Sequence, residues 1–335
     1  MFENKILRLL FLSAYGVGLM VVVLATASLF PVAAEGYPNK TIRLIIPYPP
    51  GGGSDIVARP LLQLMSASMG QPMIVENKGG AGGNIGMELV AKSPPDGYTL
   101  VLGITAQLAV NPSLYPKLSY DLLKDFSPIG QLGIAPYVLV VHPTLPVKNV
   151  REMLMIAKTH PLQLRFGSAG NGSGAHLAGG MLDSMAKVKT AHIPYKGGAL
   201  AMTDLVAGQL QFSFLTYTSS SAFIKSHRLK ALAVTTAQRS KALPDLPAIG
   251  ETVPGYDSSV WYGVLAPAGT APEIVNKLNH EFLLALNNLE FRNRLILEAF
   301  EPMGSTPAQL GALMKSEIQR WAKLVKETNL SLIHI

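Results

Sequence analysis

The chain of 335 residues contains no cysteine. This absence excludes disulfide bonds, thiolate metal sites and a lipid anchor attached through an N-terminal cysteine. Charged residues are also few, at 15% of the chain, whereas hydrophobic residues make up 48%. Such a composition is typical of a globular protein rather than a disordered one. The length is sufficient for two domains, each with its own hydrophobic core.

Patterns typical of nucleic-acid binding, metal binding and hydrolysis are missing as well. The lysines and arginines are scattered without a basic run, so the net charge of +7 favours an anionic small molecule rather than nucleic acid. The seven histidines show no metal-ligand spacing. The G-x-S-x-G elbow of hydrolases is absent, because Ser54, Ser168 and Ser173 each lack a flanking glycine that it requires. We expect neither a metal nor a cofactor.

A long apolar run occurs at the N-terminus. Lys5 and Arg8 precede an apolar stretch over residues 9–30, and small residues follow at 31–34. This order predicts a secretory signal peptide, residues 1–34, cleaved after Ala34. An uncleaved membrane anchor is the alternative, because the run is long enough to span a bilayer.

A strand, a glycine-rich turn and a helix follow one another from Ile42. The β-branched run 42–46 predicts a buried strand, and the turn 48–54 (YPPGGGS) leads into a helical pattern that begins at Ser54 and Asp55. The first N–H groups of a helix have no partner within it, and the helix dipole adds partial positive charge. An anion is therefore the expected ligand of this turn. We interpret Asp55 as a structural partner of the dipole.

The next segments continue an alternation of strands and helices, which predicts a parallel sheet with ligands beyond its carboxyl ends. Thr105 and two glycine loops fall at such ends. We expect strands at 71–77 and 98–104, a helix at 85–92 and an irregular stretch at 118–130.

The second half repeats the alternation. Two apolar strands, 137–141 and 260–266, are predicted to carry the chain from one lobe to the other and back. Between them we expect helices at 149–158, 173–185 and 197–207 and strands at 165–168, 191–195, 210–215 and within 226–235. After them we expect helices at 272–289, 295–299 and 307–328.

A second glycine-rich turn occupies residues 168–176 (SAGNGSGAH). Gly170, Gly172 and Ala175 match a loose dinucleotide pattern, but the following strand lacks the acidic residue that would hold a ribose. We interpret the turn as a second anion site that uses the hydroxyls of Ser168 and Ser173. Simple helix capping by Ser173 is the alternative.

The sequence allows two roles for each of two basic side chains in or near this turn. His176 follows Ser173 by three residues, and packing in the core is the alternative to a catalytic role. Lys196 follows the strand 191–195, where it pairs with an anion or is simply solvated.

Several segments together are similar to one family of proteins. They are IRLIIPYPPGGGSDIVAR, GQPMIVENKGGAGGNIG, SPPDGYTL, FGSAGNGSGAHLA, HIPYKGGALAMTDLVAGQ, LKALAVTT and WYGVLAPAGTAPEIVNKLN. From Tyr37 to Thr328 the chain resembles the Bug receptors, the substrate-binding proteins of tripartite tricarboxylate transporters. The resemblance implies a Venus-flytrap fold of two α/β lobes, each a mostly parallel sheet flanked by helices, with two interlobe crossing strands.

The resemblance also implies a function. It predicts a periplasmic receptor that binds a small carboxylate between its lobes and delivers it to a membrane permease of the tripartite tricarboxylate type, without catalysis and as a monomer. The expected ligand-binding positions are Tyr48, Pro49, Pro50, Gly51, Gly52, Gly53, Ser54, Thr105, Ser168, Gly170, Asn171, Gly172, Ser173, His176, Tyr195, Lys196, Gly197, Leu215 and Thr216.

One pair of positions departs from the family pattern. Relatives typically carry an Asp-Asn pair where this chain has Leu215 and Thr216. Without that acid an ammonium group would be unpaired in a desolvated site, so an α-amino acid is disfavoured as a ligand.

The expected division of the chain places 35–137 and 262–329 in lobe one and 138–261 in lobe two. The tail 330–335 (LSLIHI) resembles the translated end of a transposon used to prepare sequencing libraries, so we expect it not to be native. Two other functions stay open: a secreted enzyme that uses Ser173 and His176 on a carboxylate substrate, and a sensory co-receptor with the same fold.

Overall fold

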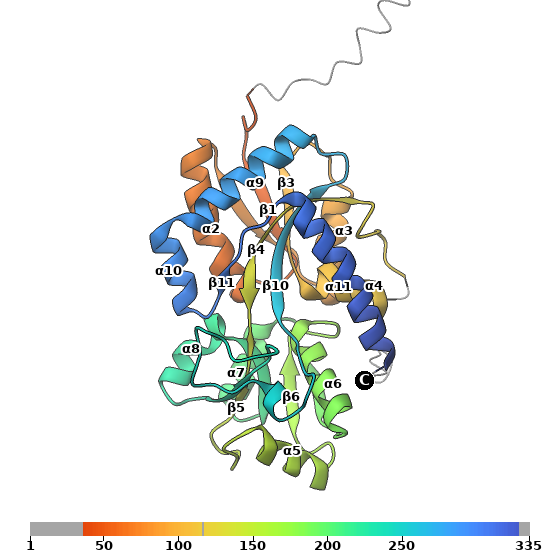
Figure 1. Ribbon diagram of the computed structural model, residues 1–335, viewed down its shortest axis with the longest axis vertical. Coiled ribbons are helices and arrows are strands. Elements are labelled where there is room, and N and C mark those ends of the chain that lie inside the picture. Colours follow the sequence, from red (N-terminus) through yellow and green to blue (C-terminus); the bar gives the residue numbers. More distant parts are fainter. Residues whose placement is uncertain (1–35, 116, 328–335) are drawn as a thin grey trace, which may run out of the picture. The chain divides into compact units, whose positions relative to one another are not determined.

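The computed structural model describes residues 36–115 and 117–327. The chain divides into two units, residues 1–37 and 38–335. Of the first unit only Gly36 and Tyr37 are described, with Gly36 in a turn at φ 96°. The predicted signal peptide and the tail 330–335 lie outside the described residues. Everything below concerns the second unit (Figure 1).

A six-stranded mixed sheet forms the centre of lobe one, in the order β11-β4-β10-β3-β1-β2. The first strand is parallel to β2 and β3, and β10 is antiparallel to β3 and β4. The run Leu44–Ile46 is fully buried, as the apolar β-branched pattern predicts for a central strand. The strands are β1 (Ile42–Ile46), β2 (Met73–Asn77), β3 (Thr99–Ile104), β4 (Phe126–Ala135), β10 (Val260–Pro267) and β11 (Glu301–Pro302).

A five-stranded mixed sheet forms the centre of lobe two, in the order β7-β6-β8-β5-β9. Strand β6 is parallel to β7 and β8, and β5 is antiparallel to β8 and β9. The strands are β5 (Tyr137–Val141), β6 (Arg165–Ser168), β7 (Ala191–Pro194), β8 (Phe212–Thr216) and β9 (Lys230–Val234).

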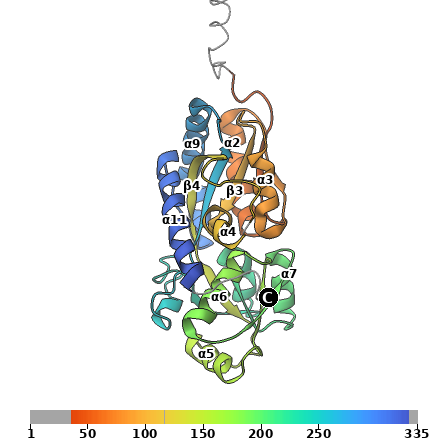
Figure 2. The ribbon, with the colours of Figure 1, turned by 90° about the vertical axis from the view of Figure 1, so that its right-hand side faces the viewer.

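Helices cover both sheets. In lobe one, α9 and α11 lie on one side of β3 and β4 and α3 on the other (Figure 2). The helices of lobe one are α2 (Gly53–Met69), α3 (Asn84–Ala91), α4 (Asn111–Leu114), α9 (Pro272–Asn287), α10 (Leu289–Leu297) and α11 (Pro307–Glu327), with short turns η2 (Ala81–Gly83) and η3 (Ala106–Val110). Those of lobe two are α5 (Val150–Thr159), α6 (Gly174–Ala186), α7 (Gly198–Val206) and α8 (Tyr217–Lys225), with η4 (Ile249–Glu251).

The predicted two-lobed α/β fold is confirmed, and the sheets prove to be mixed rather than mostly parallel. The chain passes from the first sheet to the second at Pro136, between β4 and β5, and returns through residues 235–259 to β10. The crossing strands β5 and β10 run antiparallel to their neighbours, whereas β1 and β6 each pair in parallel with the strands on either side. Each lobe therefore keeps a parallel region whose carboxyl ends face the interlobe space.

Three local predictions were wrong. The stretch predicted to be irregular, 118–130, includes the first half of β4. Pro128 and two glycines weaken the sequence signal of this strand, and its pairing with β10 contains two register shifts. Helix α8 was not predicted because its sequence, YTSSSAFIK, is polar at the start. Helix α10 begins at Leu289 rather than Leu295, since Asn288 caps it by accepting a bond from the N–H of Phe291 at 3.0 Å.

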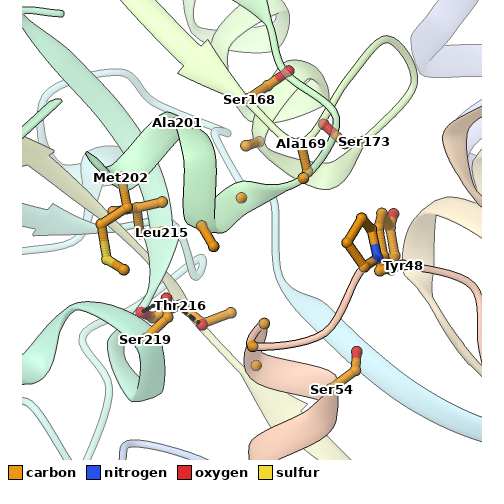
Figure 3. A pocket seen from close by; sticks show the side chains of 18 of the residues that line it. Tyr48, Ser54, Ser168, Ala169, Ser173, Ala201, Met202, Leu215, Thr216 and Ser219 are labelled. Atoms are coloured by element: carbon orange, nitrogen blue, oxygen red, sulfur yellow. Dashed lines mark hydrogen bonds between the residues drawn. The ribbon is translucent and has the colours of Figure 1, made fainter. Parts of the chain in front are cut away.

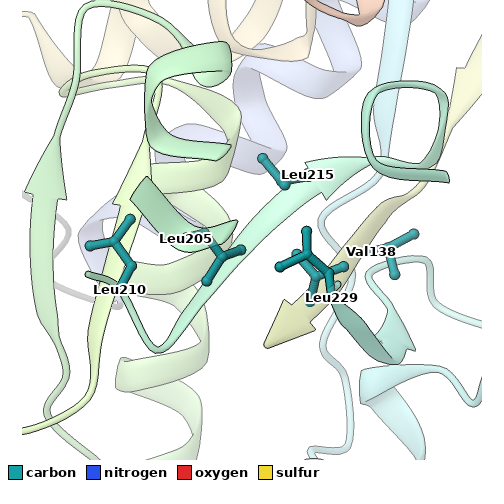
Figure 4. Close-up of a cluster of buried hydrophobic side chains, with 6 residues drawn as sticks. Val138, Leu205, Leu210, Leu215 and Leu229 are labelled. Atoms are coloured by element: carbon teal, nitrogen blue, oxygen red, sulfur yellow. The ribbon is translucent and has the colours of Figure 1, made fainter. Parts of the chain in front are cut away.

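A cluster of buried side chains joins α7 to the second sheet (Figure 4). It consists of Val138, Val140, Leu205, Leu210, Leu215 and Leu229. These residues come from β5, α7, β8 and the segments beside them, so the cluster fixes α7 on the sheet.

Replacing Leu205 by Ala should lower the free energy of unfolding by about 2–5 kcal/mol, because it leaves a cavity in this cluster. Leu297→Ala is the matched control, since Leu297 is 76% exposed and its replacement should change stability by less than about 0.5 kcal/mol. Urea denaturation followed by circular dichroism measures both; equal losses would contradict the assigned core.

Candidate functional site

A cavity of about 390 Å³ lies where turns from the two sheets meet (Figure 3). Most of the positions expected to bind the ligand line it. They are Tyr48, Pro49, Pro50, Gly51, Gly52, Gly53, Ser54, Ser168, Ser173, Lys196, Gly197, Leu215 and Thr216. The cavity is of ordinary size for a small-molecule site.

The first turn, residues 48–54, is held from behind by a buried carboxylate. Asp55 accepts hydrogen bonds from Arg59 at 2.7 Å and from the side-chain amide of Asn77 at 3.0 Å. Asn77 also donates to the backbone oxygen of Tyr48 at 3.0 Å. The acid is thus paired within its own lobe, as the structural interpretation of Asp55 predicted, although it also borders the cavity.

Glycine is needed in this turn for two reasons. Gly51 has φ 91°, a left-handed conformation that favours glycine. A side chain at Gly53 would place its Cβ 2.8 Å from the hydroxyl oxygen of Thr216, which belongs to the other lobe. The turn therefore approaches β8 more closely than any residue with a side chain allows.

The second turn, residues 168–173, presents an unsatisfied hydroxyl. Ser173 is the N-cap residue of α6, yet its side chain makes no capping bond. Its Oγ is buried and has no hydrogen-bond partner among the described residues. Buried hydroxyls almost always have a partner, so this atom requires one from a ligand or water. The capping alternative for Ser173 is wrong.

Four helices begin at the cavity wall. They are α2, α6, α7 and α8, and the residues Gly52, Ser173, Gly197 and Thr216 that precede them all line it. None of these four helices has a side-chain cap. Their first backbone N–H groups lack partners within the helices, and their dipoles add partial positive charge. The cavity can therefore bind an anion without an arginine.

Two stacked histidines support the second turn. His192 and Ser168 form a hydrogen bond of 2.6 Å between Nε2 and Oγ, and the His192 ring stacks on His176 at 4.2 Å. His176 accepts a bond from the backbone N–H of Gly172 at 3.0 Å. Burial lowers the pKa of His176 to about 4, and burial together with the neighbouring His176 lowers the pKa of His192 to about 3. Both rings are neutral near pH 7.

This arrangement differs from that of a Ser-His hydrolase. Among the described residues, the hydroxyl of Ser173, the serine proposed for catalysis, has no hydrogen bond with His176, whose Nδ1 accepts from a backbone amide. Ser168 does pair with a histidine, but the other ring nitrogen of His192 is buried without a partner in the described chain. Among the described residues no carboxylate is bonded to that ring, so the third member of a triad is missing there.

Six expected positions do not line the cavity but lie beside it: Thr105, Gly170, Asn171, Gly172, His176 and Tyr195. Thr105 joins β3 to β10, since its Oγ1 accepts from the N–H of Trp261 at 2.9 Å and donates to Ser259 O at 3.2 Å. Tyr195 donates to Asp204 at 2.6 Å. These residues shape the turns from behind.

Other residues of the cavity wall were not anticipated from the sequence. They include Ala199, Leu200, Ala201 and Met202 from α7, together with Ser213 and Ser219. The signal for α7 was available in HIPYKGGALAM, where glycine again precedes a helix at a strand end. His192 was missed because only the β6–β7 pairing brings it to Ser168.

Within the described part of the chain, hydrogen bonds outside the cavity also join the lobes. The hydroxyl of Tyr115 in lobe one donates to the backbone oxygen of Asn171 in lobe two at 3.2 Å. Ser221 of α8 donates to Glu298, which follows α10, at 3.3 Å. The two lobes are thus bonded to each other by residues outside the cavity wall.

The described residues contain no group of three or more His, Asp and Glu side chains arranged to hold a metal ion. None of the helices in the described part of the chain combines the length and apolar composition needed to cross a bilayer.

Comparison with known proteins gives consistent matches over most of the chain. The model of the family described as "Tripartite tricarboxylate transporter family receptor" matches residues 57–330. BugT of Bordetella pertussis is 37% identical over 319 residues, covering 93% of this chain and 96% of BugT.

Two solved structures share the fold. The periplasmic binding protein BugD has a TM-score of 0.84 and 34% identity, covering 88% of this chain and 99% of BugD. Rpa4515 of R. palustris, solved with adipate, has a TM-score of 0.85 and 33% identity, with the same coverage of both chains.

The buried histidines predict a specific dependence of stability on pH. With a folded pKa of about 3 and an unfolded pKa of about 6.5, His192 takes up its proton first in the unfolded chain. Its contribution to stability is complete above pH 6.5 and is lost as the pH falls toward 3. Burial raises the pKa of Asp183 to about 6. Its effect on stability therefore has the opposite sign: it favours the folded state as the pH falls.

The wild type should therefore be compared with His192→Phe, since both proteins retain Asp183 and His176. Between pH 7 and pH 5 the wild type should lose about 1–2 kcal/mol more unfolding free energy than the variant. Urea denaturation at both pH values measures this, and parallel pH profiles would show that His192 is not buried in its neutral form.

Proposed function

The chain belongs to the tripartite tricarboxylate transporter receptor family, and on that premise we propose that it is a periplasmic receptor that encloses one small carboxylate between its lobes. The single observation that supports this most directly is the buried, unpartnered hydroxyl of Ser173 at the start of α6. A carboxylate oxygen is a suitable acceptor for it. The receptor would then pass its ligand to a permease without changing it.

The proposed binding positions are those expected from the sequence. The first turn offers the N–H groups at the start of α2, and the second offers those of α6 with the hydroxyl of Ser173. Ser168 lines the same turn, with its hydroxyl bonded to His192 and Gly170. A carboxylate held in this way exchanges water for amides and hydroxyls, with ordered water completing its shell. Thr105, His176 and Tyr195 would act by holding the turns in place.

The domain boundaries and the location of the protein belong to the same proposal. Lobe one would comprise 35–137 and 262–329, and lobe two 138–261. The sheets support this division except at its edges, where Tyr137 belongs to β5 of lobe two and Val260 and Trp261 belong to β10 of lobe one. Residues 1–34 would direct the chain to the periplasm and be removed there, and the mature protein would act as a monomer.

An α-amino acid is a poor ligand for this cavity. Leu215, which occupies the place of the family's acid, lines the cavity and is 5% exposed. The acid that does border it, Asp55, already accepts bonds from Arg59 and Asn77. An ammonium group would lose its hydration without gaining a partner.

Two other functions are less well supported. A Ser-His enzyme lacks the third residue of a triad, and the relatives with known structures are solute-binding proteins. A sensory co-receptor would have the same cavity and differ only in the protein that recognises the closed lobes.

Thermal unfolding in the presence of single compounds tests the proposed function. A ligand that binds the folded state raises the melting temperature by mass action. We expect the melting temperature to rise with at least one of the plain carboxylates hexanoate, benzoate, adipate and citrate. We expect no rise with glutamate or aspartate. Incubation followed by mass spectrometry should recover the carboxylate unaltered. A large shift with glutamate alone would contradict the proposed ligand class, and conversion of the compound would indicate an enzyme.

Ser173→Ala tests the proposed hydrogen bond. The variant should bind the tightest carboxylate of that set about 10- to 100-fold more weakly, because a bond to a charged group is lost. Its unfolding free energy should not fall, since the hydroxyl has no hydrogen-bond partner among the residues that the structure describes. Ser220→Ala is the control: Ser220 is fully buried, donates to Thr216 O and is not part of the cavity wall. Isothermal titration calorimetry measures both, and unchanged affinity in Ser173→Ala would exclude this contact.

A further inference from the structure

Three tyrosines line the cavity, and two of them were not expected from the sequence. Tyr48 belongs to the first turn, whereas Tyr137 begins β5 and Tyr262 lies in β10, the two strands at which the chain crosses between the lobes. Tyr137 is 8% exposed and Tyr262 is 2% exposed. Phenol rings from both crossing strands are therefore part of the cavity wall.

The hydroxyl groups of these tyrosines influence one another. Burial, followed by the neighbouring hydroxyls of Tyr48 and Tyr262, raises the pKa of Tyr137 well above its usual range. Burial, followed by the neighbouring Tyr48, also raises the pKa of Tyr262. Burial raises the pKa of Tyr48 to about 12. All three groups keep their protons near pH 7, so each can act as a hydrogen-bond donor.

The hydroxyl of Tyr48 accepts one hydrogen bond and retains its own proton for another. The side chain of Gln107 has a fixed orientation, because its Oε1 accepts from the N–H of Ile104 at 3.2 Å and its Nε2 donates to Gly82 O at 2.6 Å. The same Nε2 donates to the hydroxyl oxygen of Tyr48 at 2.7 Å. The Tyr48 proton has no acceptor among the described residues.

The hydroxyls of Tyr137 and Tyr262 form no hydrogen bond with any residue that the structure describes. Tyr137 lies against the start of α6, since a Cβ placed on Gly174, the first residue of that helix, would collide with its hydroxyl oxygen. Gly174 directly follows Ser173, whose buried hydroxyl is also unpartnered in the described chain. Buried tyrosine hydroxyls usually have a partner, so these donors require an acceptor from a ligand or water.

The acid of the cavity wall is not available to these donors. Among the described residues that line the cavity, Asp55 is the acid, and its oxygens accept from Arg59 and Asn77. A carboxylate oxygen of a ligand is the best acceptor, because a hydrogen bond from a hydroxyl to a charged oxygen is roughly twice as strong as one between neutral groups. A cationic group there would leave the hydroxyl protons unsatisfied.

We propose that Tyr137 and Tyr262 are ligand-binding residues that, together with Tyr48, donate hydrogen bonds to a carboxylate of the ligand. The three residues will be called the tyrosine subsite. This inference rests on the proposed receptor function and adds the crossing strands to the parts of the chain that hold the ligand. Because Tyr137 and Ser173 both border the start of α6, they would bind the same carboxylate.

Removal of single hydroxyls tests the tyrosine subsite. The probe is whichever of hexanoate, benzoate, adipate and citrate the wild type binds most tightly. Tyr137→Phe and Tyr262→Phe should each bind it about 10- to 100-fold more weakly, because a hydrogen bond to a charged oxygen is lost. Neither variant should have a lower urea midpoint than the wild type, since these hydroxyls have no partner within the described chain. Titration calorimetry and urea denaturation measure the two effects.

Tyr256→Phe is the matched control. Tyr256 is 1% exposed, its hydroxyl donates to Ala178 O at 2.9 Å, and it is not part of the cavity wall. This variant should show the reverse result, with a lower urea midpoint and the affinity of the wild type. An equal loss of affinity in Tyr256→Phe would show that buried hydroxyls act on binding through the fold, and it would overturn the inference.

The remaining outcomes separate the two proposals. Wild-type affinity in Tyr137→Phe and Tyr262→Phe would show that their hydroxyls bind only water, and it would overturn the tyrosine subsite while leaving the receptor function intact. A lower urea midpoint in these variants would indicate a partner within the fold and would also overturn it. Failure of all four carboxylates to bind the wild type would overturn the receptor function and the inference with it.

Discussion

The structure depends on backbone N–H groups that the fold itself leaves unsatisfied. Four helices of the described chain begin at one cavity without side-chain caps, and the buried hydroxyl of Ser173 among them has no partner there. Buried donors of this kind are rare, because each one costs free energy unless water or a ligand accepts its hydrogen. An anion that accepts several of these hydrogen bonds at once supplies the acceptors that the first N–H groups of the helices lack. The hydrogen bonds that would bind the anion are therefore the same ones that satisfy the buried donors of the fold.

The two mixed sheets make this convergence possible. Parallel strands around β1 and β6 deliver their following helices to the carboxyl ends of the sheets, and the crossing strands turn those ends toward each other. Supporting contacts then fix each turn from behind: Asp55 with Arg59 and Asn77 in one lobe, and Ser168 with His192 in the other. Each turn is therefore held in place by contacts within its own lobe.

The fold class and the two glycine-rich turns could be predicted because neighbouring residues in the sequence specify them. In each case a strand pattern is followed by glycines and then by an amphipathic segment. The strand β4 could not be predicted, because Pro128 and the glycines of this segment disfavour a strand. The segment forms one through its pairing with β10, which the local sequence does not reveal. The apolar wall from α7 and the pairing of Ser168 with His192 were missed for a related reason. Both depend on which strands are neighbours, and that choice is made by the whole sheet rather than by the local sequence.

The hydrogen bond from Tyr115 to the backbone of Asn171 joins the two lobes directly, outside the cavity wall. A bond between the lobes lowers the free energy of the arrangement in which their turns meet. A carboxylate that binds this arrangement therefore has to supply less free energy to hold the lobes together, and more of its interaction with the turns appears as affinity.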